Sequence, residues 1–127
     1  MTGAGRTASV VLVRDGVVLG QLPPVELALP WWPEAHDVVA AARERFDLDV
    51  TVLRLLHAPG DRSSGGHVTY LAETKDAPGV ALEPYGGDPL ADEPLRQPWA
   101  RPGGPEALLA WADDELARHG IRRTGRA

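Results

Sequence analysis

The chain of 127 residues is long enough for one domain, and its 43% hydrophobic and 24% charged residues are typical of a folded globular protein. A formal net charge of −5 argues against a nucleic-acid partner held by a basic surface, and the lack of cysteine excludes disulfides, thiolate metal sites and cysteine nucleophiles. No segment has the length of a membrane span and the first residues lack a secretory pattern, so we expect a cytoplasmic protein.

The chain is predicted to begin with a β-hairpin. Residues 1–6 are small and polar, and we expect them to be frayed. β-Branched and apolar residues fill 7–13 and 17–22, and the intervening Asp15 and Gly16 are a strong two-residue turn signal.

A helix predicted over residues 33–46 organises the centre of the chain. A Pro-Pro pair ends the hairpin, and a short strand at a sheet edge is expected over 25–29 before the helix. Pro33 fits the first helical turn, and Glu34 and Asp37 lie where the helix dipole favours negative charge. Apolar side chains recur at helical spacing and form one stripe: Ala35, Val38, Val39, Ala42 and Phe46.

The second half is predicted to contain a further hairpin and a further helix. Apolar and β-branched runs at 50–57 and 67–74 flank a turn-rich loop. Proline and glycine recur through 75–104, where only a short strand at 80–82 is expected. A helix follows over 105–119. Its expected buried stripe is Leu108, Leu109, Ala112 and Leu116, with Trp111 at the margin.

The order hairpin, strand, helix, hairpin, loop and helix predicts an α+β fold. We assign residues 1–120 to a single domain. Residues 121–127 contain Arg122, Arg123 and Arg126, and we interpret them as a basic tail or a linker.

The sequence LALPWWPEAHDVVAAARERFDLDVTVLRLL, residues 27–56, resembles the core of the Nudix fold. In that family a strand and a Gly-rich loop lead into a helix that carries Arg-Glu and then Glu-Glu, closed by a Gly and an apolar residue. Its carboxylates hold Mg²⁺ or Mn²⁺ against a diphosphate. The resemblance extends loosely over residues 7–120 and implies an α/β/α sandwich with a mixed sheet.

The Nudix pattern is eroded here, and two alignments are open. In the first, Asp47 and Leu48 take the place of the closing Gly and apolar residue. Glu44 then matches the first Glu of the pair, Arg45 replaces the second, and two alanines at 40–41 replace Arg-Glu.

In the second alignment, Arg43 and Glu44 match Arg-Glu, and Asp47 and Leu48 replace the Glu pair. Either alignment keeps at most two of the family's carboxylates. The preceding loop also has Trp-Trp-Pro at 31–33 where glycines are expected. The resemblance therefore implies the fold more strongly than it implies hydrolysis.

A second resemblance concerns the protein's context. The phrases LPPVELALPWW, VTVLRLL, GGHVTYLAE, QPWARPGGP and RRTG resemble the N-terminal region of certain actinobacterial proteins. Those proteins continue into an aminoglycoside-phosphotransferase-like kinase domain. The resemblance implies that such a domain follows this one, or that the chain is a free-standing relative.

The candidate catalytic residues are carboxylates of the central helix. Asp37 and Glu44 lie one heptad apart on one helix face, and together with Glu34 they are weak candidates for holding a hard cation. The alternatives are a solvated face and, for Glu34, a role at the helix N-terminus. Arg43 is a candidate for contacting a phosphate, with a salt bridge within the helix or towards the next strand as the alternative.

The candidate ligand-binding residues are mainly aromatic. Trp31 and Trp32 could form a stacking wall for a base or an aromatic ligand, with Trp99 and Arg101 lining the same cleft. The alternative is that one tryptophan caps the core while the other is partly exposed. The histidines lack metal-ligand spacing, so no metal site is assigned.

The sequence therefore favours a non-catalytic Nudix-like domain with a binding, regulatory or assembly role and no cofactor. Two alternatives remain open. One is a hydrolase of a nucleoside diphosphate derivative, with Mg²⁺ or Mn²⁺ at Glu44, and the other is a metal-independent enzyme that reuses the cleft. The expected partners are a small-molecule or nucleotide ligand and a kinase-like domain on the C-terminal side, and a homodimer is left open.

Overall fold

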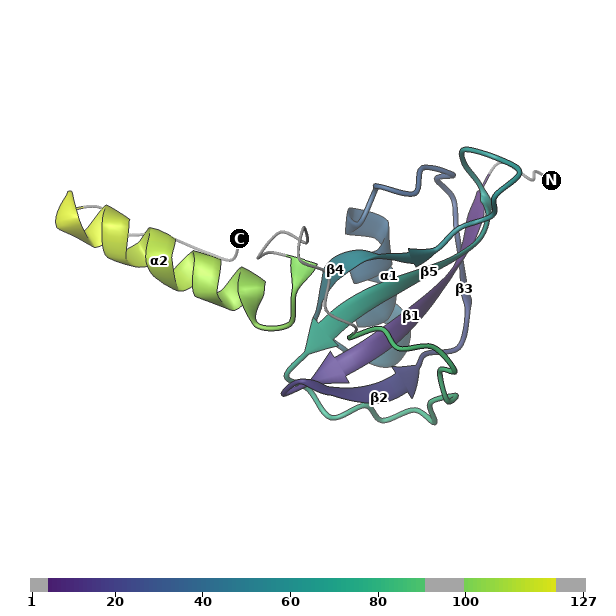
Figure 1. Cartoon of the computed structure of the whole chain (residues 1–127), viewed down its shortest axis with the longest axis horizontal. Coiled ribbons are helices and arrows are strands. Elements are labelled where there is room, and N and C mark those ends of the chain that lie inside the picture. Colours follow the sequence, from purple (N-terminus) through teal and green to yellow (C-terminus); the bar gives the residue numbers. More distant parts are fainter. Residues whose placement is uncertain (1–4, 91–99, 121–127) are drawn as a thin grey trace.

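The structure is a computed structural model that describes residues 5–90 and 100–120. These residues form a mixed α+β domain built on a five-stranded sheet (Figure 1). The elements are β1 (Arg6–Arg14), β2 (Val17–Gln21), β3 (Val25–Leu27), α1 (His36–Phe46), β4 (Val50–His57), β5 (Gly66–Thr74) and α2 (Gly104–Arg118).

The predicted N-terminal hairpin is confirmed. β1 and β2 pair antiparallel, with Arg14 opposite Val17 across the turn. Asp15 and Gly16 have positive φ angles of 52° and 76°, as a tight turn between twisted strands requires. The expectation that Arg6 is frayed is wrong, because Arg6 begins β1 and is only 3% exposed.

β1 lies inside the sheet, whose order is β2-β1-β5-β4. One side of β1 pairs in parallel with β5, from Arg6 opposite Gly66 to Val13 opposite Glu73. The other side pairs with β3 at the beginning of β1 and with β2 at its end. β2 and β3 therefore share one edge, and the predicted edge position of β3 is confirmed.

β4 and β5 form the predicted second hairpin, which places β4 at the opposite edge of the sheet. The two strands pair antiparallel from Val50 opposite Thr74 to His57 opposite Thr69, with two register shifts. The expected strand at 80–82 is absent from the structure. That segment contributes only an isolated bridge between Glu83 and Gln21.

α1 covers one face of the sheet and builds the main core. It begins at His36 rather than at residue 33, because 31–34 form a turn in which the Glu34 amide donates to the Trp31 carbonyl oxygen at 3.2 Å. Val38 and Ala42 are buried as predicted, and Phe46 is only partly buried. Ala41 is also buried, so the helix face that was expected to be solvated is turned towards the protein at this position.

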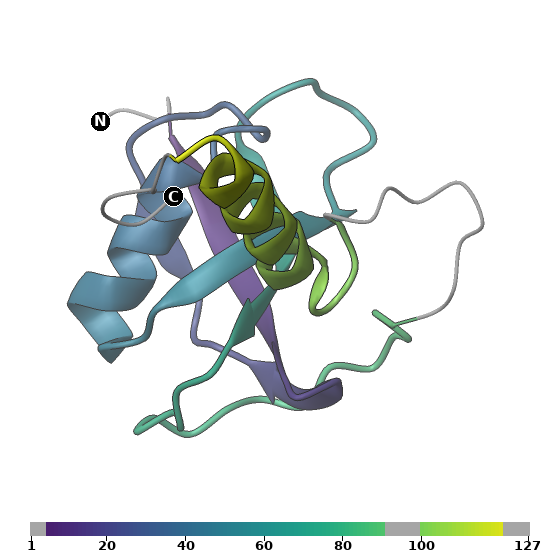
Figure 2. The ribbon, with the colours of Figure 1, turned by 90° about the vertical axis from the view of Figure 1, so that its left-hand side faces the viewer.

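The opposite face of the sheet has a smaller core, which α2 does not cover. Val11, Val13, Leu53 and Leu71 are buried there, and Tyr85 and Leu90 pack against them. α2 has no buried residue, so the predicted buried stripe of this helix is wrong. Only the N-terminal end of α2 lies beside the sheet, and the helix points away from it (Figures 1 and 2). α2 therefore does not form the second helix layer of the expected sandwich.

Neither helix in the described part of the chain combines the length and the apolar character that a bilayer span requires.

Candidate functional site

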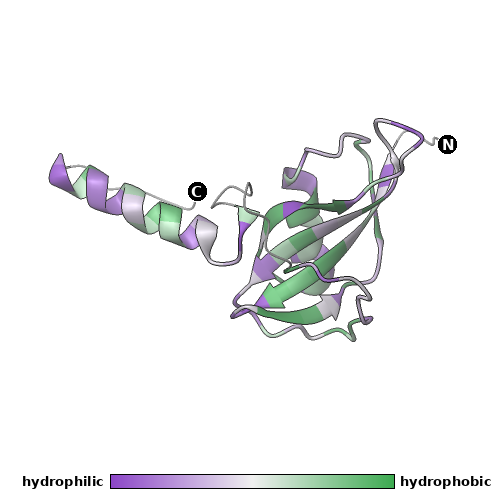
Figure 3. Ribbon diagram, viewed as in Figure 1, coloured by the Kyte–Doolittle hydropathy of each residue, from purple (hydrophilic) through white to green (hydrophobic). Residues whose placement is uncertain are grey.

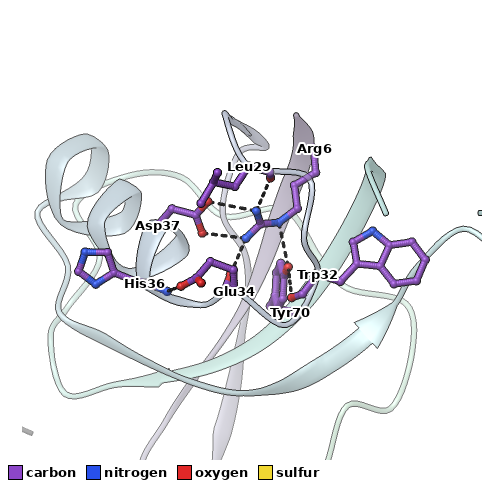
Figure 4. A network of polar contacts seen from close by, with 7 residues as sticks. All are labelled: Arg6, Leu29, Trp32, Glu34, His36, Asp37 and Tyr70. Atoms are coloured by element: carbon purple, nitrogen blue, oxygen red, sulfur yellow. Dashed lines mark hydrogen bonds and ion pairs between the residues drawn. The ribbon is translucent and has the colours of Figure 1, made fainter. Parts of the chain in front are cut away.

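Arg6 is the centre of a polar network that joins β1, β5, α1 and the loop before α1 (Figure 4). Its side chain is fully buried, at 0% exposure. All five of its N–H donors are used. Nε donates to the Tyr70 hydroxyl, and the two terminal nitrogens donate to the backbone oxygens of Leu29 and Glu34 and to the Asp37 carboxylate.

The pair between Arg6 and Asp37 is bidentate. Nη2 lies 2.8 Å from Oδ1 and Nη1 lies 3.0 Å from Oδ2. Burial alone would lower the pKa of Arg6, but the hydrogen bonds that Arg6 donates to Asp37 and Tyr70, together with the charge of Asp37, outweigh it, so the pKa of Arg6 is raised. Both oxygens of Asp37 are thus engaged in holding the first turn of α1 on the sheet.

Tyr70 extends the network to the tryptophans. Its hydroxyl accepts from Arg6 and donates to the backbone oxygen of Trp32 at 2.7 Å. Burial raises the pKa of Tyr70, although the hydrogen bond from Arg6 opposes the shift. The neutral phenol therefore holds the loop before α1 against β5.

The two tryptophans have different environments. Trp32 packs against the main core, and its Nε1 donates to the Gly65 backbone oxygen at 2.9 Å. The Gly65 amide in turn donates to the Pro30 oxygen at 2.8 Å, and Gly65 has a φ of +71° that favours glycine. Trp31 is 58% exposed. One tryptophan therefore caps the core and the other is exposed, as in the alternative to a stacking wall. Ligand binding by either residue stays a prediction.

The other candidate residues do not converge on Asp37. Glu34 Oε1 accepts from the His36 amide at 3.3 Å and so serves the first turn of α1. Glu44 is exposed, seven residues after Asp37, which separates the two by roughly 10 Å along the helix axis. A Mg²⁺ ligand lies only about 2 Å from the ion. No three His, Asp or Glu side chains within residues 5–90 and 100–120 are placed to hold a metal ion.

One of the two candidate arginines, Arg43, is held in a salt bridge. Arg43 Nη1 bonds Asp49 Oδ1 at 2.9 Å, which is a salt bridge directed towards the beginning of β4. Arg101 is exposed, and the partner predicted for it, Trp99, lies outside the described residues.

A Ser-His contact that the sequence did not suggest lies on the opposite face of the sheet. Ser9 Oγ on β1 is 2.7 Å from His67 Nε2 on β5. The two residues are 58 apart in sequence, so only the parallel pairing of β1 and β5 reveals the contact. Ser9 is 3% exposed, which keeps its hydroxyl away from any substrate in solution and favours a structural role.

A recess with an acidic lining lies elsewhere, at the base of α2. Its volume is about 850 Å³, and the first turns of α2 and the neighbouring ends of β4 and β5 line it. Lys75 and Glu106 form an ion pair of 2.8 Å across it, which raises the pKa of Lys75. Glu73 accepts from the Gly103 amide at 2.7 Å. None of the predicted site residues that the structure describes lines this recess.

Comparisons of the chain with protein-family models, with curated proteins and with solved structures find no match.

Proposed function

We propose that this chain is a Nudix-like domain that acts by binding, in a regulatory or assembly role, rather than by metal-dependent hydrolysis. The observation that carries the proposal is the C-terminal end of α1. Asp47 has a left-handed backbone conformation, with φ 54° and ψ 41°, and the next residue, Leu48, is 1% exposed. A left-handed residue followed by a buried apolar one is the arrangement that a closing Gly and apolar pair would adopt.

This geometry supports the first of the two alignments. The amides of Asp47 and Leu48 donate to the oxygens of Arg43 and Ala42, each at 3.2 Å, and the bond from the left-handed Asp47 to Arg43 is that of an αL cap. The family's Arg-Glu pair then corresponds to two alanines at 40–41, and Arg45 stands at the second Glu. Of the family's carboxylate positions in this alignment, only that of Glu44 still carries a carboxylate.

One carboxylate is too few to hold the metal ion that Nudix-type hydrolysis requires. Mg²⁺ gives up its hydration shell reluctantly and needs several oxygen ligands in octahedral geometry. Glu44 has Arg43 and Arg45 as neighbours in sequence, whose charges repel a cation. Asp37, the other acid on this side of α1, already binds Arg6 through both oxygens.

The role in assembly is supported by α2, which leaves the domain with large apolar side chains exposed. Leu108 is 51% exposed and Trp111 is 62% exposed. Such residues at the C-terminal side suit a helix that packs on another protein surface. A phosphotransferase-like kinase domain remains our proposed neighbour, on the strength of the sequence resemblance.

A hydrolysis assay tests the proposal. The purified chain is incubated with Mg²⁺ or Mn²⁺ and with ADP-ribose, dinucleoside polyphosphates, nucleotide sugars or nucleoside triphosphates, beside the variant Glu44→Gln. We expect no turnover above the buffer rate for either protein. Turnover that Glu44→Gln removes would support the metal-dependent hydrolase instead, and metal-independent turnover that survives the substitution would support the third reading, an enzyme that reuses the cleft.

A further inference from the structure

α2 presents an apolar surface that the described part of the chain leaves incompletely buried, with Leu108 and Trp111 exposed and its other members partly buried. Leu108, Ala112 and Leu116 recur every four residues and therefore lie on one side of the helix, with Trp111 at the margin. Figure 3 shows apolar positions alternating with hydrophilic ones along α2. We call these four residues the α2 stripe. Exposed apolar surface of this kind marks a site of interaction in a folded protein.

The charges around the α2 stripe are mostly negative. α2 contains four acidic residues and one arginine. Glu115 lies one turn after Trp111 and two turns after Leu108, so it projects within the stripe. It forms an exposed ion pair with Arg118 at 2.8 Å. A surface that is apolar and acidic together favours a partner that is apolar and basic.

The recess at the base of α2 adjoins the α2 stripe and is also negatively charged. Leu109 of α2 lines the recess on its apolar side. Its acidic lining residues outnumber its one lysine, Lys75. They are Asp15, Asp49, Glu73, Asp76 and Glu106. Several of these carboxylates bond backbone amides or Arg and Lys side chains, but the lining keeps a net negative charge.

We propose that the α2 stripe and the recess at its base form a docking surface for a cationic amphipathic protein segment. In this arrangement the partner's apolar side chains cover Leu108 and Trp111, and its lysines or arginines face Glu115 and the carboxylates of the recess. The inference rests on the proposed binding function and names the class of partner.

A second copy of the chain fits this surface less well. Two α2 helices packed stripe to stripe would bring together two helices that each carry an excess of negative charge. The whole chain also has a net charge of −5, which adds to the repulsion between copies. A basic partner can cover the same apolar residues without that electrostatic repulsion.

The test measures binding of a labelled synthetic helix of leucine and lysine to the full chain by fluorescence anisotropy. A leucine–glutamate helix of equal length is the control probe. We expect saturable binding of the first probe only, weakened by about tenfold or more in Trp111→Ala, as for a central aromatic anchor. Because α2 has no buried residue, this variant should keep the thermal unfolding midpoint of the native chain.

Two substitutions with the same change in charge separate docking from general attraction. Glu115→Gln removes a carboxylate within the α2 stripe. Asp61→Asn removes an exposed carboxylate on the loop between β4 and β5, which lies at the end of the sheet away from α2 (Figure 1). We expect the first to weaken binding of the basic probe by at least about threefold and the second to leave it unchanged.

Three results would overturn the inference. They are no binding of the basic probe, equal losses in Glu115→Gln and Asp61→Asn, and self-association in sedimentation experiments that Leu108→Glu abolishes, since a second copy would then cover the stripe. The hydrolysis assay is independent of these results. Metal-dependent turnover with intact probe binding would refute the proposed function alone, and lost probe binding without turnover would refute the docking surface alone.

Discussion

Arg6 and Asp37 are 31 residues apart in sequence and form a bidentate ion pair between the first residue of β1 and the first turn of α1. The Arg6 side chain is 0% exposed and the Asp37 side chain is 23% exposed. Because the same guanidinium also holds two backbone oxygens and Tyr70, the pair fixes the position of the loop that carries both neighbouring tryptophans.

The first prediction concerns this ion pair. Arg6→Met leaves Asp37 without its counter-ion and leaves backbone oxygens of the loop unsatisfied. We expect a loss of about 3–5 kcal/mol in the free energy of unfolding, as for other buried pairs from which one partner is removed. Urea denaturation measures the loss.

Arg43→Met is the matched control for that prediction. It also removes an ion pair between an arginine and an aspartate, since Arg43 and Asp49 are 2.9 Å apart. The difference is exposure, because these two side chains are 58% and 41% exposed. We expect a loss below about 1 kcal/mol. Equal losses in the two variants would show that the Arg6 network does not hold the fold together.

The second prediction concerns the pH dependence of stability. Burial raises the pKa of Tyr70 above its ordinary value of 10.0. The folded state then holds the phenol proton more tightly than the unfolded state, so this contribution to stability is fully present below about pH 10 and is lost as the pH rises through the folded pKa. We expect the free energy of unfolding to fall as the pH rises above about 10, and to fall less steeply in Tyr70→Phe.

The comparison of slopes separates this effect from the loss of hydrogen bonds. Tyr70→Phe also removes the hydroxyl contacts with Arg6 and Trp32, which should cost about 1–3 kcal/mol at neutral pH. That loss lowers the free energy of unfolding at neutral pH and does not by itself change its slope at alkaline pH. An alkaline slope identical to that of the native chain would mean that Tyr70 is not the group that titrates.

The third prediction separates the two tryptophans. Trp32→Ala removes a ring packed on the core and a hydrogen bond to Gly65, and we expect a loss of about 3 kcal/mol. Trp31→Ala should change the free energy of unfolding by less than about 0.5 kcal/mol, because the ring is mostly exposed. Chemical denaturation followed by circular dichroism measures both variants. A larger loss in Trp31→Ala would reverse the assignment.

Local patterns in the sequence predicted the elements that depend on near neighbours. The Asp15 and Gly16 turn, the hairpin of β4 and β5, and the buried Val38 and Ala42 of α1 all follow from residues close together in the chain. Periodicity also predicted that α2 is a helix. It could not predict what covers the apolar side of α2, because that depends on a surface elsewhere in this chain or on another molecule.

The long-range features could not be predicted in this way. Arg6 follows a small, polar N-terminus, and nothing near it in the sequence indicates burial. Its role depends on the parallel pairing of β1 with β5 and on Asp37, both distant in the chain. Asp37 was therefore interpreted as a candidate metal ligand, although the structure pairs both of its oxygens with Arg6.

Binding of Mn²⁺, followed by the electron paramagnetic resonance signal of the free ion, tests the central proposal that α1 carries no metal site. The titration compares the native chain with Glu44→Gln and with Glu34→Gln, which removes the exposed glutamate before the helix. We expect all three proteins to leave the ion free throughout the micromolar range. Micromolar binding by the native chain that Glu44→Gln abolishes and Glu34→Gln retains would contradict the account.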